Sequence, residues 1–498
     1  MNKETALDTL AKNQASLAAL DHAVSILYID GETVAPRGSA EYRAKTLGEL
    51  SRMTYELTTD PEAEKAIEFL NEIKDTLDPV MSRNVSELYR TLDRTRKIPL
   101  SEVVDFNMLI SSASSVWHEA KEKNDYPLFK PYLTKIFDSM KRQSEYVNKD
   151  EDPYNYTLDL FERGLTRKKC DAFFASLRKR LVPVIKKVTS APQIDDAPIL
   201  PLFSVGEQEK ISALIMDMMN IDPAYCTLGQ TEHPFTANVN KHDVRITTHY
   251  FAENFLSSLY SVIHEGGHAL YELNVGDELV GTCLAGGVSM AIHESQSRFY
   301  ENYIGRSRPF CNVLYDLLNS EFNNRLADIS KNNFYRMINK SAPSLIRTDA
   351  DELTYSMHIM IRYELEKKLF DGTIDTDSLP GEWNRLYEEY LGIEVPNDRM
   401  GVLQDSHWSN ANIGYFPSYA IGSAYGAQYL DLMNKEFDVY SEVSLGDFTK
   451  INLWLCDKIW KHGKMFDPAD LFRSVCGEFD PEVYCSYLEK KFCGIILC

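Results

Sequence analysis

The chain has 498 residues, of which 53 are basic and 74 acidic, and its formal net charge is −21. This acidic balance excludes nucleic-acid binding and attachment to an anionic membrane as main functions, because both depend on clustered positive charge. The nine cysteines include no Cys-x-x-Cys pair and are odd in number, which favours a reducing compartment over a secreted disulfide framework.

The first 185 residues are predicted to form successive amphipathic helices. Four runs rich in Leu, Ala, Glu, Lys and Arg lie between Pro and Gly breaks, at positions 3–26, 39–58, 61–76 and 79–95. The N-terminus is charged and helix-like and lacks the apolar segment of a signal peptide. No apolar stretch approaches the roughly eighteen residues that a membrane-spanning helix needs. We therefore expect a cytoplasmic protein that has no nucleic-acid partner and no membrane partner.

The best strand pattern lies at 235–249. Val244 and Ile246 alternate there with Arg245 and Thr247, as in a strand with one buried face. An extended peptide could pair with its edge, and a purely structural edge strand is at least as good an interpretation. Further helices are predicted at 308–330, 351–369 and 379–391, with an aromatic and Gly-rich stretch at 400–430 and short helices from 445 onward. The patterns together predict a mostly α-helical fold with one small β-sheet.

A His-Glu-x-x-His motif, with His264, Glu265 and His268, occupies the helical run after this strand. Residues i and i+4 lie one above the other on a helix, so both imidazoles can reach one metal ion while Glu265 projects beside them as a general base. Glu294 lies near the start of a second predicted helix and is the candidate third ligand. Three protein ligands and one open position are typical of catalytic zinc.

Two alternatives remain open for these residues. The histidines may be ordinary core or surface residues at a common helical spacing. His293 is a rival third ligand, but it points about 100° away from Glu294 around the helix axis, so only one of the two is expected to bind the metal.

Five other segments accompany the metal motifs: His233-Pro-Phe235, Asp243-Val-Arg245-Ile-Thr247, Ile346-Arg347-Thr-Asp-Ala-Asp351, Gly401-Val-Leu-Gln404-Asp405-Ser-His407-Trp408 and Gly414-Tyr415-Phe-Pro-Ser-Tyr419. With them the chain resembles the carboxypeptidase Taq family of zinc metallocarboxypeptidases. The resemblance implies a large two-lobed helical fold with a deep groove, the small sheet near the metal, and a homodimer. It also implies one catalytic unit over 1–498, with 1–230 in the N-terminal lobe, 231–430 as the zinc and substrate-binding segment, and 431–498 as a helical C-terminal segment.

Peptide hydrolysis assigns roles to these residues. Zinc lowers the pKa of a bound water, and Glu265 can accept the proton of that water and later deliver it to the leaving amine. Cobalt is a possible substitute for zinc. By the resemblance, His407 and Tyr419 are candidates to stabilise the oxyanion of the tetrahedral intermediate.

A carboxypeptidase must also recognise the free C-terminus of its peptide substrate. A guanidinium suits this task because it offers paired donors and keeps its charge. Arg347 is the first candidate and Arg245 the second. Internal ion pairs are an equally open interpretation, with Asp349 or Asp351 as partners of Arg347 and Asp243 as the partner of Arg245.

The sequence thus predicts a metallocarboxypeptidase that releases single C-terminal amino acids. A helical zinc oligopeptidase or endopeptidase acting on short peptides would use the same metal helix, and only the position of cleavage distinguishes it. An inactive binding protein is disfavoured because Glu265 and the ligand set are intact.

Overall fold

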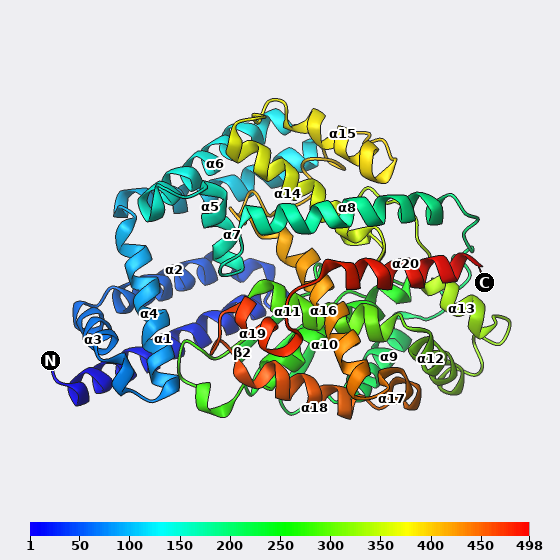
Figure 1. Cartoon of the computed structure of the whole chain (residues 1–498), viewed down its shortest axis with the longest axis horizontal. Helices are drawn as coiled ribbons and strands as arrows, with labels where there is room; N and C mark the ends of the chain where they lie inside the picture. Colours follow the sequence, from blue (N-terminus) through cyan, green and yellow to red (C-terminus); the bar gives the residue numbers. More distant parts are fainter. Residues whose placement is uncertain (498) are drawn as a thin grey trace.

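A computed structural model describes residues 1–497, and helices dominate it (Figure 1). The nine helices of its N-terminal part are α1 (Lys3–Thr33), α2 (Ala40–Thr58), α3 (Pro61–Glu72), α4 (Pro79–Lys97), α5 (Leu100–Lys123), α6 (Tyr126–Asn148), α7 (Pro153–Phe161), α8 (Arg167–Thr189) and α9 (Val205–Met218). Asp60 and Asp78 cap α3 and α4 with their side chains, and proline occupies the first position of both helices. These signals explain why the predicted starts at 61 and 79 are confirmed.

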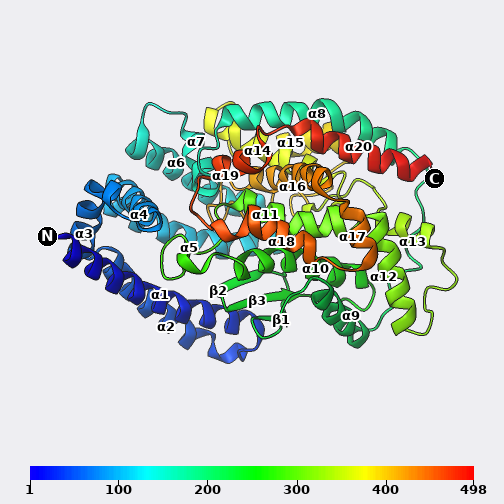
Figure 2. The same ribbon diagram turned by 60° about the horizontal axis from the view of Figure 1, so that its bottom comes forward.

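A three-stranded sheet follows, with β1 (Cys226–Gln230), β2 (Thr236–Asn240) and β3 (Asp243–Thr248) in the order β1-β3-β2. β1 runs parallel to β3, and β2 pairs with it in antiparallel orientation. The predicted alternation is confirmed in β3, where Val244 and Ile246 are fully buried. Figure 2 shows the sheet between α1 and α10. Strand β1 was not predicted.

The remaining helices are α10 (Phe255–Leu273), α11 (Met290–Arg298), α12 (Arg308–Glu321), α13 (Lys331–Ile338), α14 (Tyr355–Asp371), α15 (Leu379–Leu391), α16 (Phe416–Glu436), α17 (Val439–Leu445), α18 (Thr449–Lys458), α19 (Pro468–Cys476) and α20 (Pro481–Leu497). A π-helical segment, Phe299–Gly305, continues α11. The helix predicted over 308–330 ends early, because Asn323 and Asn324 adopt left-handed backbone conformations.

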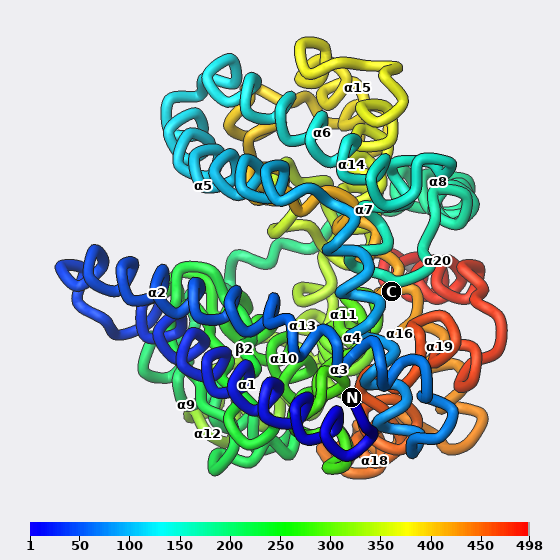
Figure 3. Tube along the Cα trace, turned by 90° about the vertical axis from the view of Figure 1, so that its left-hand side faces the viewer, coloured from blue at the N-terminus to red at the C-terminus, as the bar shows by residue number. Residues whose placement is uncertain are grey.

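The helices form two groups that agree with the predicted lobes. Figure 3 shows α5, α6 and α15 on one side of the molecule and α1 and α2 on the other. The largest buried apolar cluster extends from Ala113 to Ile495, whereas α1, α3 and α4 share a smaller cluster around Leu10 and Leu70. The mostly α-helical class with a small sheet is confirmed. The groove and the division at residues 230 and 430 stay predictions.

Two observations bear on the environment of the chain. None of the helices within residues 1–497 is both long enough and apolar enough to cross a membrane. Eight of the nine cysteines, those from Cys170 to Cys493, are free thiols, and Cys498 lies outside the described residues.

Candidate active site

Close contact between α10 and α11 makes the site possible. Asn254 precedes α10 as predicted, but its side chain does not cap the helix, whereas Ser289 caps α11 by accepting a hydrogen bond from Ile292 N. Gly267 of α10 lies directly against α11: a Cβ atom there would lie 2.7 Å from Gln296 O. Only glycine permits this approach, which sets Glu294 of α11 opposite the histidines of α10.

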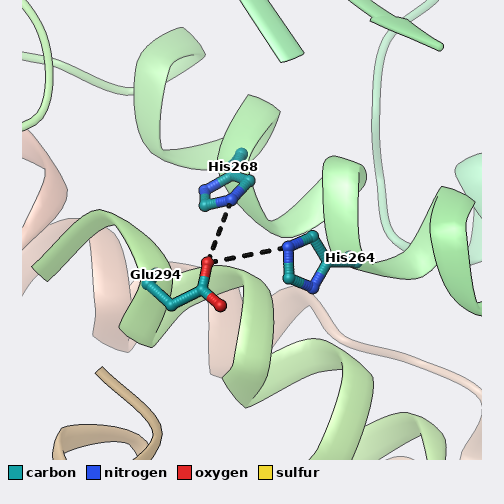
Figure 4. Close-up of side chains that lie close together, drawn as sticks. All are labelled: His264, His268 and Glu294. Atoms are coloured by element: carbon teal, nitrogen blue, oxygen red, sulfur yellow. Dashed lines mark ion pairs between the residues drawn. The ribbon is translucent and has the colours of Figure 1, made fainter. Parts of the chain in front are cut away.

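His264, His268 and Glu294 converge on one point (Figure 4). The Oε2 atom of Glu294 lies 3.6 Å from Nε2 of His264 and 3.5 Å from Nε2 of His268. Donors at about 2.0–2.1 Å from a tetrahedral zinc ion are roughly 3.3 Å apart, so these separations fit a metal of that size. The trio therefore has the donor set and spacing of a divalent metal site.

Buried charges around the trio favour metal binding. Arg298 donates from Nε to Oε1 of Glu294 over 2.7 Å, which leaves Oε2 facing the histidines. Burial opposes ionisation of Glu294, but Arg298 outweighs it and holds the pKa of this carboxyl well below its usual range. Burial and the neighbouring His293 lower the pKa of His268 to about 3, so that this imidazole is neutral at pH 7. A carboxylate and a neutral imidazole are the forms that bind metals.

Each ligand histidine is held on its second ring nitrogen. His264 Nδ1 lies 2.9 Å from Oε2 of Glu301, a residue of the π-helical segment. His268 Nδ1 lies 2.6 Å from Nδ1 of His293. His293 is thus outside the converging trio, in agreement with the expectation that either it or Glu294 binds the metal, but not both.

Glu265 lies between the trio and the edge strand β2. Thr236 of β2 donates its hydroxyl to Oε2 of Glu265 over 2.5 Å. Burial raises the pKa of the Glu265 carboxyl, while His264 and the Thr236 hydroxyl act in the opposite direction. A buried carboxylate with a raised pKa, held by one hydroxyl donor, is suited to exchange protons with water.

The structure also brings His407 and Tyr419 together, since His407 Nε2 lies 3.1 Å from the Tyr419 hydroxyl. Burial and the nearby Arg347 lower the pKa of His407 to about 3, which makes it a neutral hydrogen-bonding group. Tyr419 lies one helical turn before Gly422, where a Cβ atom would be 2.8 Å from Cβ of Glu294. The pair therefore lies next to the metal trio.

The ion pair of Arg347 differs from the prediction. Its Nε donates to Asp405 over 2.9 Å and its Nη1 donates to the Tyr355 hydroxyl over 3.2 Å. Arg362 donates to the other oxygen of Asp405. Asp349 and Asp351 were the wrong partners. Asp351 instead accepts hydrogen bonds from the backbone and hydroxyl of Thr354 and so caps the turn that leads into α14.

Arg245 forms the ion pair that the sequence left open. Its guanidinium donates to both oxygens of Asp243, each over 2.8 Å. Arg245 pairs with Ala237 of β2, and Ile246 pairs with Thr236. Since Thr236 contacts Glu265 and neighbouring residues of a strand alternate faces, Arg245 lies on the face turned away from the metal helix.

Sequence reasoning missed Glu272, Arg298 and Glu301. Glu272 lies four residues after His268 on α10, and Arg298 lies four residues after Glu294 on α11. Acidic or basic residues one helical turn from a ligand are a usable signal. Glu301 gave a weaker one, because it lies in a π-helical segment that a 3.6-residue period does not describe.

Comparison with known proteins agrees with this geometry. A sequence model of the family described as "Carboxypeptidase Taq (M32) metallopeptidase" matches residues 9–492. The chain is 39% identical over 480 residues to "Carboxypeptidase 1" of Bacillus subtilis, covering 95% of each chain. It is 35% identical over 508 residues to "Thermostable carboxypeptidase 1" of Pyrococcus furiosus, covering 98% of each. The solved M32 carboxypeptidase of Deinococcus radiodurans superposes with a TM-score of 0.95 at 32% identity, covering 99% of this chain and 100% of that chain.

Proposed function

The chain belongs to the carboxypeptidase Taq (M32) family of metallopeptidases and is a metallocarboxypeptidase; we propose that its metal is zinc, held by His264, His268 and Glu294. The observation that carries this proposal is the convergence of two imidazole nitrogens on one carboxylate oxygen at 3.5 and 3.6 Å. Two nitrogens and one oxygen form a typical ligand set of catalytic zinc, and cobalt is the expected substitute.

Within the proposed mechanism Glu265 acts as the general base. Bound zinc supplies a lowered pKa of water and polarises the scissile carbonyl. Glu265 accepts a proton from the attacking water and returns it to the leaving amine, with Thr236 orienting its carboxyl. His407 and Tyr419 are proposed to donate hydrogen bonds to the oxyanion of the tetrahedral intermediate.

The substrate is proposed to lie along β2. This strand is an edge of the described sheet, and its Thr236 contacts the base, so an extended peptide paired with β2 passes close to Glu265. Arg347 is the proposed partner of the terminal carboxylate. Its Nε and Nη1 are bonded within the protein, whereas Nη2 has no hydrogen-bond partner among the described residues. Arg245 is the weaker candidate, because it lies on the other face of the sheet.

Mass spectrometry of a peptide digest tests the proposal. Residues are expected to leave one at a time from the C-terminus. A C-terminally amidated peptide should be cleaved about tenfold to a hundredfold more slowly than the free acid, because one charge-assisted hydrogen bond contributes about 1.5–3 kcal/mol. Arg347→Ala should lose most of that discrimination. Internal cleavage, or equal cleavage of acid and amide, would instead favour an oligopeptidase.

A homodimer and a cytoplasmic location also remain proposals, supported by the family resemblance and by the free cysteines. Light scattering on the purified enzyme tests the first, and fractionation of the source cells tests the second.

A further inference from the structure

His293 has a place in the structure that ligand binding does not explain. Its Nδ1 faces Nδ1 of His268 at 2.6 Å, and its Nε2 lies 2.7 Å from Oε1 of Glu272. Glu272 is fixed in turn by Gly287 N, which donates to Oε1 over 3.1 Å, and by the side chain of Asn238 on β2. A continuous chain of hydrogen bonds therefore runs from the edge strand to a metal ligand.

Only one arrangement of protons satisfies this chain when His268 binds metal through Nε2. His268 must then carry its hydrogen on Nδ1 and donate it to His293. His293 must accept on Nδ1 and carry its own hydrogen on Nε2. The carboxylate of Glu272 is a pure acceptor and stabilises that second hydrogen. Each member thus selects the tautomer of the next.

Two glycines make room for this arrangement. A Cβ atom at Gly287 would lie 2.5 Å from Cδ2 of His293, and Gly286 has a φ of +104° with its Cα beside Glu272. Residues with side chains are strained at such a φ, and a side chain at 287 would displace the His293 ring. The Gly286-Gly287 pair therefore shapes the pocket that holds His293.

We propose that Glu272 and His293 are positioning residues that fix the tautomer and orientation of His268 for metal binding. The inference rests on the proposed metal site and adds two residues to it. It also explains an asymmetry: His264 is held directly by the carboxylate of Glu301, whereas His268 is held by a carboxylate acting through a second imidazole. Outer partners of this kind commonly change metal affinity by about 10–100-fold.

Zinc binding to the metal-free full-length enzyme tests the relay, with the affinity measured by competition against a chromophoric chelator. His293→Phe removes both ring nitrogens and should weaken zinc binding about 10–100-fold. His293→Asn retains an acceptor near the Nδ1 position and should recover part of that loss. Nitrogen-15 NMR of histidine-labelled metal-free protein should show His268 in the Nδ1–H form in the wild type and a shift toward Nε2–H in His293→Phe.

A double-mutant cycle separates a relay from general damage. Glu272→Gln should weaken zinc binding in the wild type and have no further effect in His293→Phe or in His293→Asn, because both lack the link to Glu272. The matched control is Glu301→Gln, which acts on His264 and should multiply the effect of His293→Phe. If His293→Phe does not fold, the His293→Asn arm of the cycle decides.

Three outcomes would overturn the relay: unchanged zinc affinity in His293→Phe, equal effects of Glu272→Gln in all backgrounds, or loss of zinc in His293→Phe as complete as in His268→Ala. The last would make His293 a ligand. A wild-type protein that binds no zinc would refute the proposed metal site itself, which is a different result from any of these.

Discussion

Replacing Gly267 by alanine tests how strictly the metal site depends on the contact between α10 and α11. The new Cβ atom would lie 2.7 Å from Gln296 O and 2.8 Å from the Cα atom of Ser297. Both atoms belong to the backbone of α11 and cannot rotate away. Since non-bonded carbon atoms prefer a separation of at least about 3.5 Å, the helices must part by roughly 0.7 Å.

The neighbouring Gly266 provides a matched control. A Cβ atom there would meet Cε and Sδ of Met219 at 2.8 and 2.9 Å, the far end of a flexible side chain. Both substitutions gain about 1 kcal/mol of helix propensity. Gly267→Ala also carries an overpacking cost of about 1–3 kcal/mol, which Gly266→Ala largely avoids. We therefore expect Gly267→Ala to be less stable than Gly266→Ala by about 1–3 kcal/mol.

Metal affinity gives a second readout of the same substitution. Parting the helices moves Glu294 away from His268, whereas a zinc site tolerates errors of only about 0.2 Å in its ligand distances. Gly267→Ala should weaken zinc binding at least about tenfold, and Gly266→Ala should leave it nearly unchanged. Urea unfolding of the metal-free proteins and zinc competition measure both effects. Equal unfolding midpoints and equal zinc affinities in the two variants would refute the reasoning.

Four further predictions concern the chemistry of the site. Glu265→Gln should keep its metal and lose about 10²–10⁴-fold in kcat, measured with metal content on one sample; near-normal turnover would remove Glu265 as the base. Alanine at His264, His268 or Glu294 should each deplete zinc, and a chelator should abolish wild-type activity until zinc or cobalt is added; a variant that retains full zinc would not have lost a ligand. Because burial raises the pKa of Glu265 and the base must be ionised, kcat/KM should fall as pH drops through a value above the ordinary glutamate range, and this limb should be absent from the residual activity of Glu265→Gln. Asp405→Asn should lose about 3–5 kcal/mol at pH 7, measured by urea unfolding, because two buried guanidinium groups lose their partner. Although burial opposes it, these groups hold the pKa of Asp405 well below its usual range, so this contribution is present above that range and is lost only as pH falls through the lowered value; wild-type stability in Asp405→Asn would refute it.

Local spacing was enough to predict the metal trio. His264 and His268 are one helical turn apart, and Glu294 follows a Gly-rich turn that suggested a helical hairpin. The structure places all three together because those two helices do pack. The helix starts at 61 and 79 were equally local, since a capping Asp and a proline lie within two positions of each other.

Long-range partners were beyond reach of the same reasoning. Arg347 pairs with Asp405, 58 residues away, whereas the nearby Asp351 is used as a helix cap. Proximity in sequence favoured the wrong carboxylate, because a capping role leaves no trace other than the start of the next helix. β1 was missed for a related reason: it pairs in parallel with β3 across intervening chain and carries no hairpin signal.

The π-helical segment after α11 bears on how such a site can change in evolution. A π-helical turn contains one residue more than the α-helical turn it replaces, and each residue of an α-helix advances the chain by about 100° around the axis. A single-codon insertion in an ancestral α-helix is thus sufficient to turn Glu301 toward His264 without altering Glu294. The same arithmetic makes the segment intolerant of deletions. Losing one residue between Arg298 and Glu301 would leave α11 intact and still remove the direct support of one metal ligand.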